Sequence, residues 1–249
     1  MKKQICFIVV IFCLIVCCSQ VQAQSADDII KQVDNLMNPN AKIRAKLIHV
    51  TKAGKIDVNS VFWIYAKENN QKIIVRTISS ISNAGRDNDM AMIEENIWFY
   101  DVQSGRVMKI PSNQSFGGTD FSYGDVLRLN LTDNYEASIL SQNKNTWFLN
   151  LKAKDRNAPY YRIEYDIQKE GYIPVKGTCY GKNDEVIKIM EFSEVKEING
   201  RLKPTKITIT SPHSKGAYSA MDFISEELKN YPDNIFNKRN LALRIEENY

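Results

Sequence analysis

Few residues in this chain have the chemistry for catalysis. Its two histidines, His49 and His213, have no second histidine at metal-ligand spacing. Ser211 and Ser214 flank His213, but neighbours in sequence do not make a catalytic triad, and we interpret the stretch as a turn. Cys179 lies in a strand-like segment without a basic neighbour in sequence, which indicates an inert buried thiol. The sequence therefore predicts that the protein is not an enzyme.

One short motif resembles a metal site. Asp87-Asn88-Asp89 begins like a calcium-binding loop. Such a loop needs glycine at its sixth position and glutamate at its twelfth, where this chain has Met92 and Trp98. A polar turn explains the motif better. No phosphate-binding glycine loop is present either, so we expect neither a metal nor a cofactor.

Large apolar side chains offer a different chemistry, the binding of an apolar ligand. Flat rings and flexible methionines adapt to irregular acyl chains, although each such residue taken alone is more typical of a packed core. The candidate lining of an apolar cavity is Trp63, Met90, Met92, Trp98, Phe99, Met108, Phe116 and Phe121.

The elements that would position these residues are mostly strands. Ile29, Ile30, Val33, Leu36 and Met37 predict one amphipathic helix, with Ser25 or Asp27 as its cap. From residue 41 onward the hydrophobic pattern has period two, with glycines between the runs. The expected strands are 42–51, 56–66, 71–79, 90–93, 97–101, 106–110, 134–141, 147–152, 160–167, 172–179, 185–195, 206–209 and 217–224.

These strands predict a mainly β fold of the α+β type, an antiparallel sandwich or a strongly curved, barrel-like sheet. The strands at 61–65 and 97–100 are apolar on both faces, so other elements must cover the second face. The first helix and a short helix near 122–129 are the candidates. Such a covering is either a plain core or a lid over a ligand cavity.

A distinctive motif fills residues 97–126. It consists of an aromatic strand, a hairpin turn at 103–105, the sequence Arg106-Val107-Met108-Lys109-Ile110-Pro111, a flexible loop and a helix start. Gly118, Asp120, Tyr123 and Asp125 would position that loop and helix, with Asp120 or Ser122 as the cap.

This motif resembles the LolA-like family of outer-membrane lipoprotein-sorting proteins of Gram-negative bacteria. Weaker similarity lies in Lys203-Pro204-Thr205 and in Asp233-Asn234-Ile235-Phe236, and Gly124 stands where many relatives carry an acidic residue. The resemblance implies a half-open antiparallel β-barrel of about 11 strands. It also implies helices over the concave side and an apolar cavity for the acyl chains of a lipoprotein or lipid. An inner-membrane exporter and an outer-membrane acceptor are the partners it implies.

Residues 1–23 have the three parts of a secretory signal peptide. Lys2 and Lys3 precede an apolar run, and Val21-Gln22-Ala23 is a cleavage pattern. We expect one lipid-binding domain at 24–249, monomeric and periplasmic, since no linker divides it. The alternative is a lipid anchor on Cys17 or Cys18.

Charge argues against nucleic acid as a partner, because 33 basic residues nearly balance 29 acidic ones. The basic strand Lys42-Arg44-Lys46 is interpreted as a solvated sheet edge in preference to a patch for anionic lipid. Two functions remain: a periplasmic carrier of acyl chains, or a β-rich adaptor of an envelope complex with a packed interior.

Overall fold

The computed structural model describes residues 24–82, 88–93, 96–127 and 130–243. The expected signal peptide with Cys17 and Cys18, and Asp87 of the calcium-like motif, lie outside the described residues. The strands are β1 (Ala41–Val50), β2 (Ile56–Lys67), β3 (Lys72–Ser82), β4 (Asp89–Ile93), β5 (Asn96–Asp101), β6 (Arg106–Ile110), β7 (Tyr135–Gln142), β8 (Thr146–Ala153), β9 (Arg162–Gln168), β10 (Ile173–Tyr180), β11 (Val186–Ile198), β12 (Arg201–Thr210) and β13 (Tyr218–Leu228).

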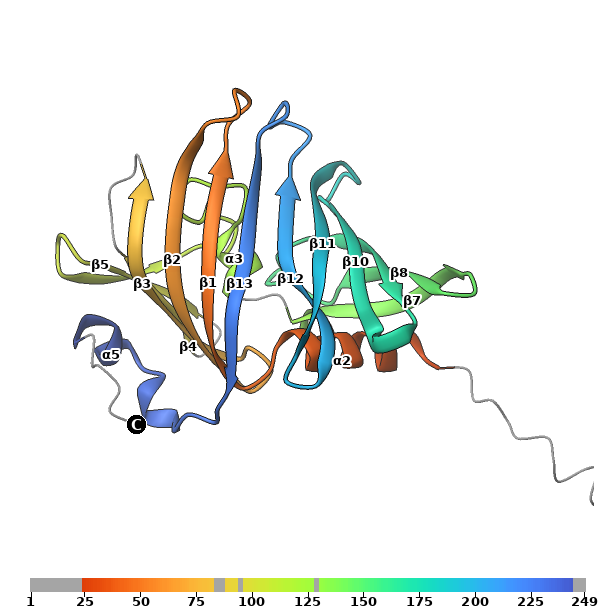
Figure 1. The fold of residues 1–249 in the computed structure, drawn as a ribbon, viewed down its shortest axis with the longest axis horizontal. Helices are drawn as coiled ribbons and strands as arrows, with labels where there is room; N and C mark the ends of the chain where they lie inside the picture. The colour runs from red at the N-terminus through yellow and green to blue at the C-terminus, as the bar shows by residue number, and fades with distance from the viewer. Residues whose placement is uncertain (1–23, 83–87, 94–95, 128–129, 244–249) are drawn as a thin grey trace, which may run out of the picture.

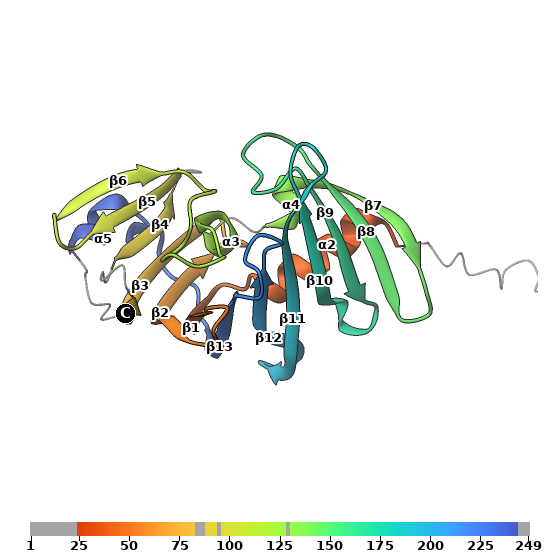
Figure 2. The same cartoon turned by 90° about the horizontal axis from the view of Figure 1, so that it is seen from above.

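All of these strands form one antiparallel sheet in the order β6-β5-β4-β3-β2-β1-β13-β12-β11-β10-β9-β8-β7. The sheet curves strongly without closing, so β6 and β7 remain as its two edges (Figures 1 and 2). The expectation of a mainly β, half-open barrel is confirmed, and the described residues supply thirteen strands where the resemblance implied about 11.

The position of β1 corrects one sequence interpretation. β1 lies between β2 and β13 in the middle of the sheet, with Lys42 opposite Tyr65 and Glu227. The basic strand is therefore not a sheet edge. Its charged side chains instead cover an aromatic neighbour, since the Lys42 ammonium lies 4.6 Å from the Trp63 ring centre and the Arg44 guanidinium 5.9 Å from it.

The first helix, α2 (Ala26–Met37), forms as its periodicity predicts. Ser25 caps it by accepting a hydrogen bond from the Asp28 backbone N–H at 3.1 Å. Ile29, Ile30 and Val33 are almost fully buried against the sheet. Their burial, at about 1.5–3 kcal/mol per side chain, holds α2 across the strands from β7 to β12.

The face that α2 covers is called the inner face. It carries the large apolar cluster, which also includes side chains from α3 (Tyr123–Leu127) and α4 (Leu131–Asn134). Both short helices lie within the bend of the sheet in the view from above (Figure 2). The residues that follow the β5–β6 hairpin are therefore brought back over the inner face.

The opposite, outer face has a second, smaller cluster. Tyr65, Ile74 and Ala91 pack there against the C-terminal segment, which holds η2 (Asp233–Ile235) and α5 (Lys238–Leu243). The Arg76 guanidinium fixes α5 by donating to the backbone oxygens of Asn240 and Leu241. A further 3-10 turn, η1 (Glu170–Tyr172), joins β9 to β10. Among the described residues, no helix combines the length and the apolar character needed to cross a bilayer.

Candidate functional site

The loop after β6 is a small hairpin, called here the aromatic hairpin (residues 114–123). Ser115 and Ser122 form a β-bridge, and the Phe116 N–H donates to the Phe121 carbonyl at 2.7 Å. Gly117 and Gly118 make its tip, with φ of 61° and 78°, a conformation that favours glycine. The sequence predicted a flexible loop here, whereas these backbone hydrogen bonds order it.

Aromatic rings carry the hairpin onto the inner face. The Phe116 ring centre lies 5.4 Å from that of Phe62 and 5.3 Å from that of Tyr123, and the Tyr123 ring meets Phe99 edge-on at 6.2 Å. Such tilted and edge-to-face pairs add about 0.5–1.5 kcal/mol each to the gain from burial. The hairpin is thus part of the core of the barrel.

Asp120 fastens the same hairpin to the sheet. Its carboxylate accepts hydrogen bonds from the Ser214 hydroxyl at 2.7 Å and the Ser219 hydroxyl at 2.8 Å, and its own N–H donates to Ser219 Oγ at 2.9 Å. His49 Nδ1 lies 3.4 Å from the carboxylate. We call this group the Asp120 latch. Asp120 was one of the two candidate caps of α3 in the sequence analysis, and it does not cap that helix.

The Asp120 latch brings serine, histidine and aspartate together without the geometry of a catalytic triad. In a triad the two ring nitrogens of histidine divide the work, one facing the acid and the other the nucleophile. Here His49 Nδ1 is the nitrogen near both Ser219 Oγ, at 2.9 Å, and Asp120. Ser219 is also fully buried. The arrangement holds a loop and presents no accessible nucleophile.

Ser122 and Asp125 cap α3 reciprocally. The Asp125 N–H donates to Ser122 Oγ at 3.2 Å, and the Ser122 N–H donates to Asp125 Oδ2 at 2.7 Å. The buried Asp125 carboxylate also accepts from the Tyr160 hydroxyl and forms an ion pair with the Lys188 ammonium at 2.8 Å. Through Ser122 and Lys188, Asp125 of α3 thereby connects the end of the aromatic hairpin to β11.

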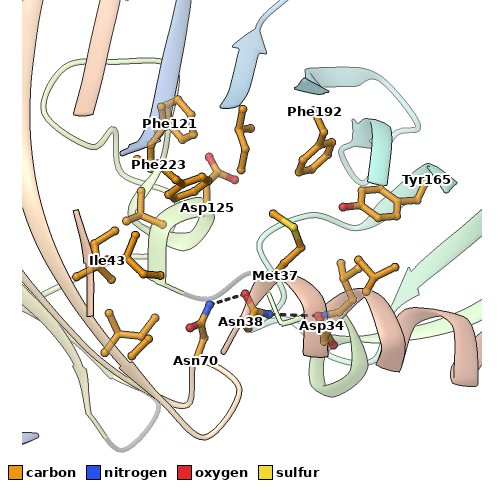
Figure 3. Close-up of a pocket in the computed structure, with 18 residues that line it drawn as sticks. Asp34, Met37, Asn38, Ile43, Asn70, Phe121, Asp125, Tyr165, Phe192 and Phe223 are labelled. Atoms are coloured by element: carbon orange, nitrogen blue, oxygen red, sulfur yellow. Dashed lines mark hydrogen bonds between the residues drawn. The ribbon is translucent and has the colours of Figure 1, made fainter. Parts of the chain in front are cut away.

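A small cavity, the inner cavity, lies between α2 and the sheet (Figure 3). Met37 of α2 and the following Asn38 form one side, Phe121 lies opposite them, and Ile43 faces Tyr165 across it (Figure 3). Its volume is about 90 Å³. An apolar cavity of about 150 Å³ admits benzene, so the inner cavity as it stands is too small for an acyl chain.

A larger hollow, the mouth pocket, lies under the other side of the aromatic hairpin. Its volume is about 310 Å³, and its apolar lining includes Met90, Phe99, Phe116 and Tyr123. Burial raises the pKa of Tyr123 to about 12. Phe116 and Tyr123 therefore bound the hollow as neutral, largely apolar groups at ordinary pH.

The structure distributes the predicted cavity residues and the predicted loop-positioning residues over several places. Phe121 and Asp125 line the inner cavity, while Gly118 lines the mouth pocket with the four residues just named. Met92 is buried and borders a polar cleft beside Asn130 and Asp133. Met108 pairs with Phe99 but is 41% exposed, because β6 is an edge strand.

Trp63 and Trp98 do not lie where the sequence analysis placed them. Both pack in the outer-face cluster and line neither the inner cavity nor the mouth pocket. Their neighbours Phe62, Ile64 and Phe99 take the inner face instead. Successive side chains of a strand point to opposite faces, and β2 and β5 are apolar on both, so their composition did not distinguish the faces.

Several lining residues come from elements that the sequence analysis left without a site. Asp34 of α2 lines the inner cavity and accepts from the N–H groups of Leu131 and Thr132, at 3.0 and 2.7 Å. Burial raises the pKa of Asp34, against the lowering effect of these bonds. The period-two pattern of β9 contained a signal for Tyr165, while β11 to β13 supply Phe192, Ile207, Met221 and Phe223.

Two kinds of reactive group remain, the free thiol and the side chains that could bind a metal. Cys179 is fully buried, and burial raises the pKa of its thiol although Lys188 lies opposite it in the sheet. Within the described ranges, no three His, Cys, Asp or Glu side chains gather as a metal site would require. The geometry of the inner face supports binding by apolar contact.

The open half-barrel of this protein, with helices on its inner face, has the architecture of the LolA-like fold. A family model described as uncharacterized protein-like matches residues 69–242, more than half of the chain, and the chain belongs to that family. Comparison with curated proteins finds no match.

Three solved structures share the fold. A LolA superfamily protein from Nitrosomonas europaea has a TM-score of 0.77 at 20% identity, over 87% of this chain and 99% of that one. A DUF1329 family protein from Desulfovibrio piger has a TM-score of 0.73 at 16% identity, over 87% and 97%. An outer membrane lipoprotein-sorting protein domain from Vibrio parahaemolyticus has 0.71 at 17%, over 86% and 97%. At these identities the likeness concerns the fold.

Proposed function

We propose that the protein is a periplasmic carrier that binds acyl chains of a lipoprotein or lipid on its inner face. The observation that carries this proposal is the aromatic hairpin, which lies between two hollows with apolar side chains in their lining and is attached at one end by the polar Asp120 latch. Displacing its rings would join the mouth pocket to the inner cavity and free room for a chain.

The energetics suit reversible binding. Each buried methylene contributes about 0.8 kcal/mol, so eight of them contribute about 6 kcal/mol before ordering costs. That figure corresponds to dissociation constants of tens of micromolar or weaker. A carrier that must release its load works in this range. Moving the rings of the hairpin away from Phe62 and Phe99 costs free energy as well, so the affinity is lowered further.

The delivery route follows from the same proposal. The expected signal peptide, cleaved after Ala23, would place a monomeric carrier in the periplasm, between an inner-membrane exporter and an outer-membrane acceptor. A lipid on Cys17 or Cys18 would instead tether it to a membrane. The intact mass of the exported protein separates a Gln24 start from an acylated cysteine.

The direct test is purification of residues 24–249 from the periplasm, followed by mass spectrometry of an organic extract and titration with a fluorescent fatty acid. Co-purified lipid or saturable binding is expected. If no lipid is extracted and no probe binds, the carrier proposal is wrong.

One observation favours the second candidate, an adaptor that docks on an envelope complex. The inner cavity holds only about 90 Å³, as a packed interior would. The same titration distinguishes the two functions, because an adaptor binds no acyl probe even at high concentration.

A further inference from the structure

The mouth pocket has a polar side that the apolar contacts leave unused. Ser60, Thr77, Ser80, Asn88 and Ser115 line it. Ser60 and Ser80 satisfy each other with a hydroxyl–hydroxyl hydrogen bond of 2.8 Å, and the Thr77 hydroxyl donates to the Asn88 backbone oxygen at 2.5 Å. No charged side chain is among the described residues that line this pocket.

One polar group of the mouth pocket remains without a partner. The Asn88 Oδ1 atom is buried and accepts no hydrogen bond from the described residues. The Tyr123 ring, which also lines this pocket, is buried against Phe116. A buried acceptor that is left unpaired costs free energy. A ligand that donates a hydrogen bond to it removes that cost, and this adds to the binding free energy.

We propose that the mouth pocket binds the uncharged polar end of an acyl ligand, an amide or hydroxyl group that donates to Asn88 Oδ1. This inference rests on the proposed carrier function and names the ligand class. An amide N–H or a hydroxyl supplies the missing donor, whereas a carboxylate or a phosphate supplies only acceptors and would meet no cation among the described lining residues.

The positions of the two hollows also give a bound acyl chain a direction. The mouth pocket includes Leu47 of β1 and Phe62 of β2, while the inner cavity includes Ile43 and Ile64 of the same strands. These residues are four positions apart on β1 and two apart on β2, about 13 and 7 Å, so the two hollows follow one another along the inner face. With its polar end at Asn88, an acyl chain would extend past the Phe116 ring toward the inner cavity.

The test compares two ligands with the same chain. Equilibrium dialysis at pH 8 measures the affinity of residues 24–249 for palmitoylethanolamide, an uncharged amide, and for palmitate. We expect the amide to bind about tenfold tighter, and Asn88→Leu to remove that preference while palmitate binding stays the same. Asn183→Leu, in the β10–β11 turn, is the matched control.

The dialysis results separate this inference from the carrier function. Equal binding of amide and carboxylate by the unaltered protein, or equal weakening of both by Asn88→Leu, overturns this inference and leaves the carrier function in place. Binding of neither ligand overturns the carrier function itself. A third arm uses a lipopeptide with an N-acylated terminus and the same peptide lacking that amide. If the N-acylated lipopeptide binds more tightly than palmitoylethanolamide, lipoproteins are the source of the ligand. If palmitoylethanolamide binds more tightly, free lipids are the source.

Discussion

Removing the Asp120 carboxylate should loosen the aromatic hairpin without emptying the core. In Asp120→Ala the hydroxyls of Ser214 and Ser219 lose an acceptor at 2.7 and 2.8 Å, and His49 loses a neighbour at 3.4 Å. Two bonds to a charged acceptor, one of them from a fully buried serine, amount to a net loss of about 2 kcal/mol. The fraction of molecules in which the hairpin is displaced from the inner face should therefore rise about 30-fold.

Hydrogen exchange and stopped-flow fluorescence measure the two consequences separately. The amides of Phe116, Thr119 and Tyr123 bond within the hairpin, and their exchange should accelerate by about the same factor. If the hairpin must move before a chain binds, the uptake rate of a fluorescent fatty acid should rise with it. Asp233→Ala, on the outer face, should change neither rate.

The two measurements can also refute the reasoning. Unchanged amide exchange in Asp120→Ala would show that the latch does not hold the hairpin. Faster exchange with an unchanged uptake rate would show that chains reach the inner face by another route. Loss of the folded state would leave the milder Ser214→Ala, which removes one bond to Asp120, as the informative variant.

Three further outcomes are expected. Asp125→Leu leaves the partly buried ammonium of Lys188 unpaired and should lower the free energy of unfolding, measured by urea denaturation, by about 3 kcal/mol. The folded-state pKa of Tyr123 is raised to about 12, so the stability that its neutral form contributes is complete below pH 10. That stability is lost as the pH rises from 10 to 12, and the loss should be absent in Tyr123→Phe. Gly124→Glu should cost about 2 kcal/mol in the same urea assay, because a Cβ there would lie 3.1 Å from the Ser112 carbonyl oxygen.

The strands could be predicted because their signals are local. Alternation of apolar and polar residues, interrupted by glycine at the turns, predicted the position of every strand of the sheet, although β12 begins five residues before its predicted start and β13 ends four residues after its predicted end. The N-terminal helix was predicted for the same reason, since Ser25 and the apolar positions of α2 lie within one short segment.

What the sequence did not reveal depends on pairing between distant segments. β1 pairs with β13 at the other end of the chain, and this pairing turned an expected edge strand into a central one. The Asp120 latch joins His49 to Ser219 across 170 residues, so its members had no common local pattern. Asp120 was singled out in the motif, but no pattern in the sequence linked it to His49, Ser214 or Ser219.

The small inner cavity and the carrier function are compatible because of what fills the barrel. Phe116 and Tyr123 pack against Phe62 and Phe99, so a ligand must replace apolar contacts that the protein already makes with itself. Fully burying one such ring contributes about 1.5–3 kcal/mol, equal to about two to four methylenes. Short apolar molecules cannot compensate for displacing two rings, whereas a long acyl chain can. The aromatic hairpin that reduces the empty volume would thus select for chain length, a property that a permanently packed adaptor lacks.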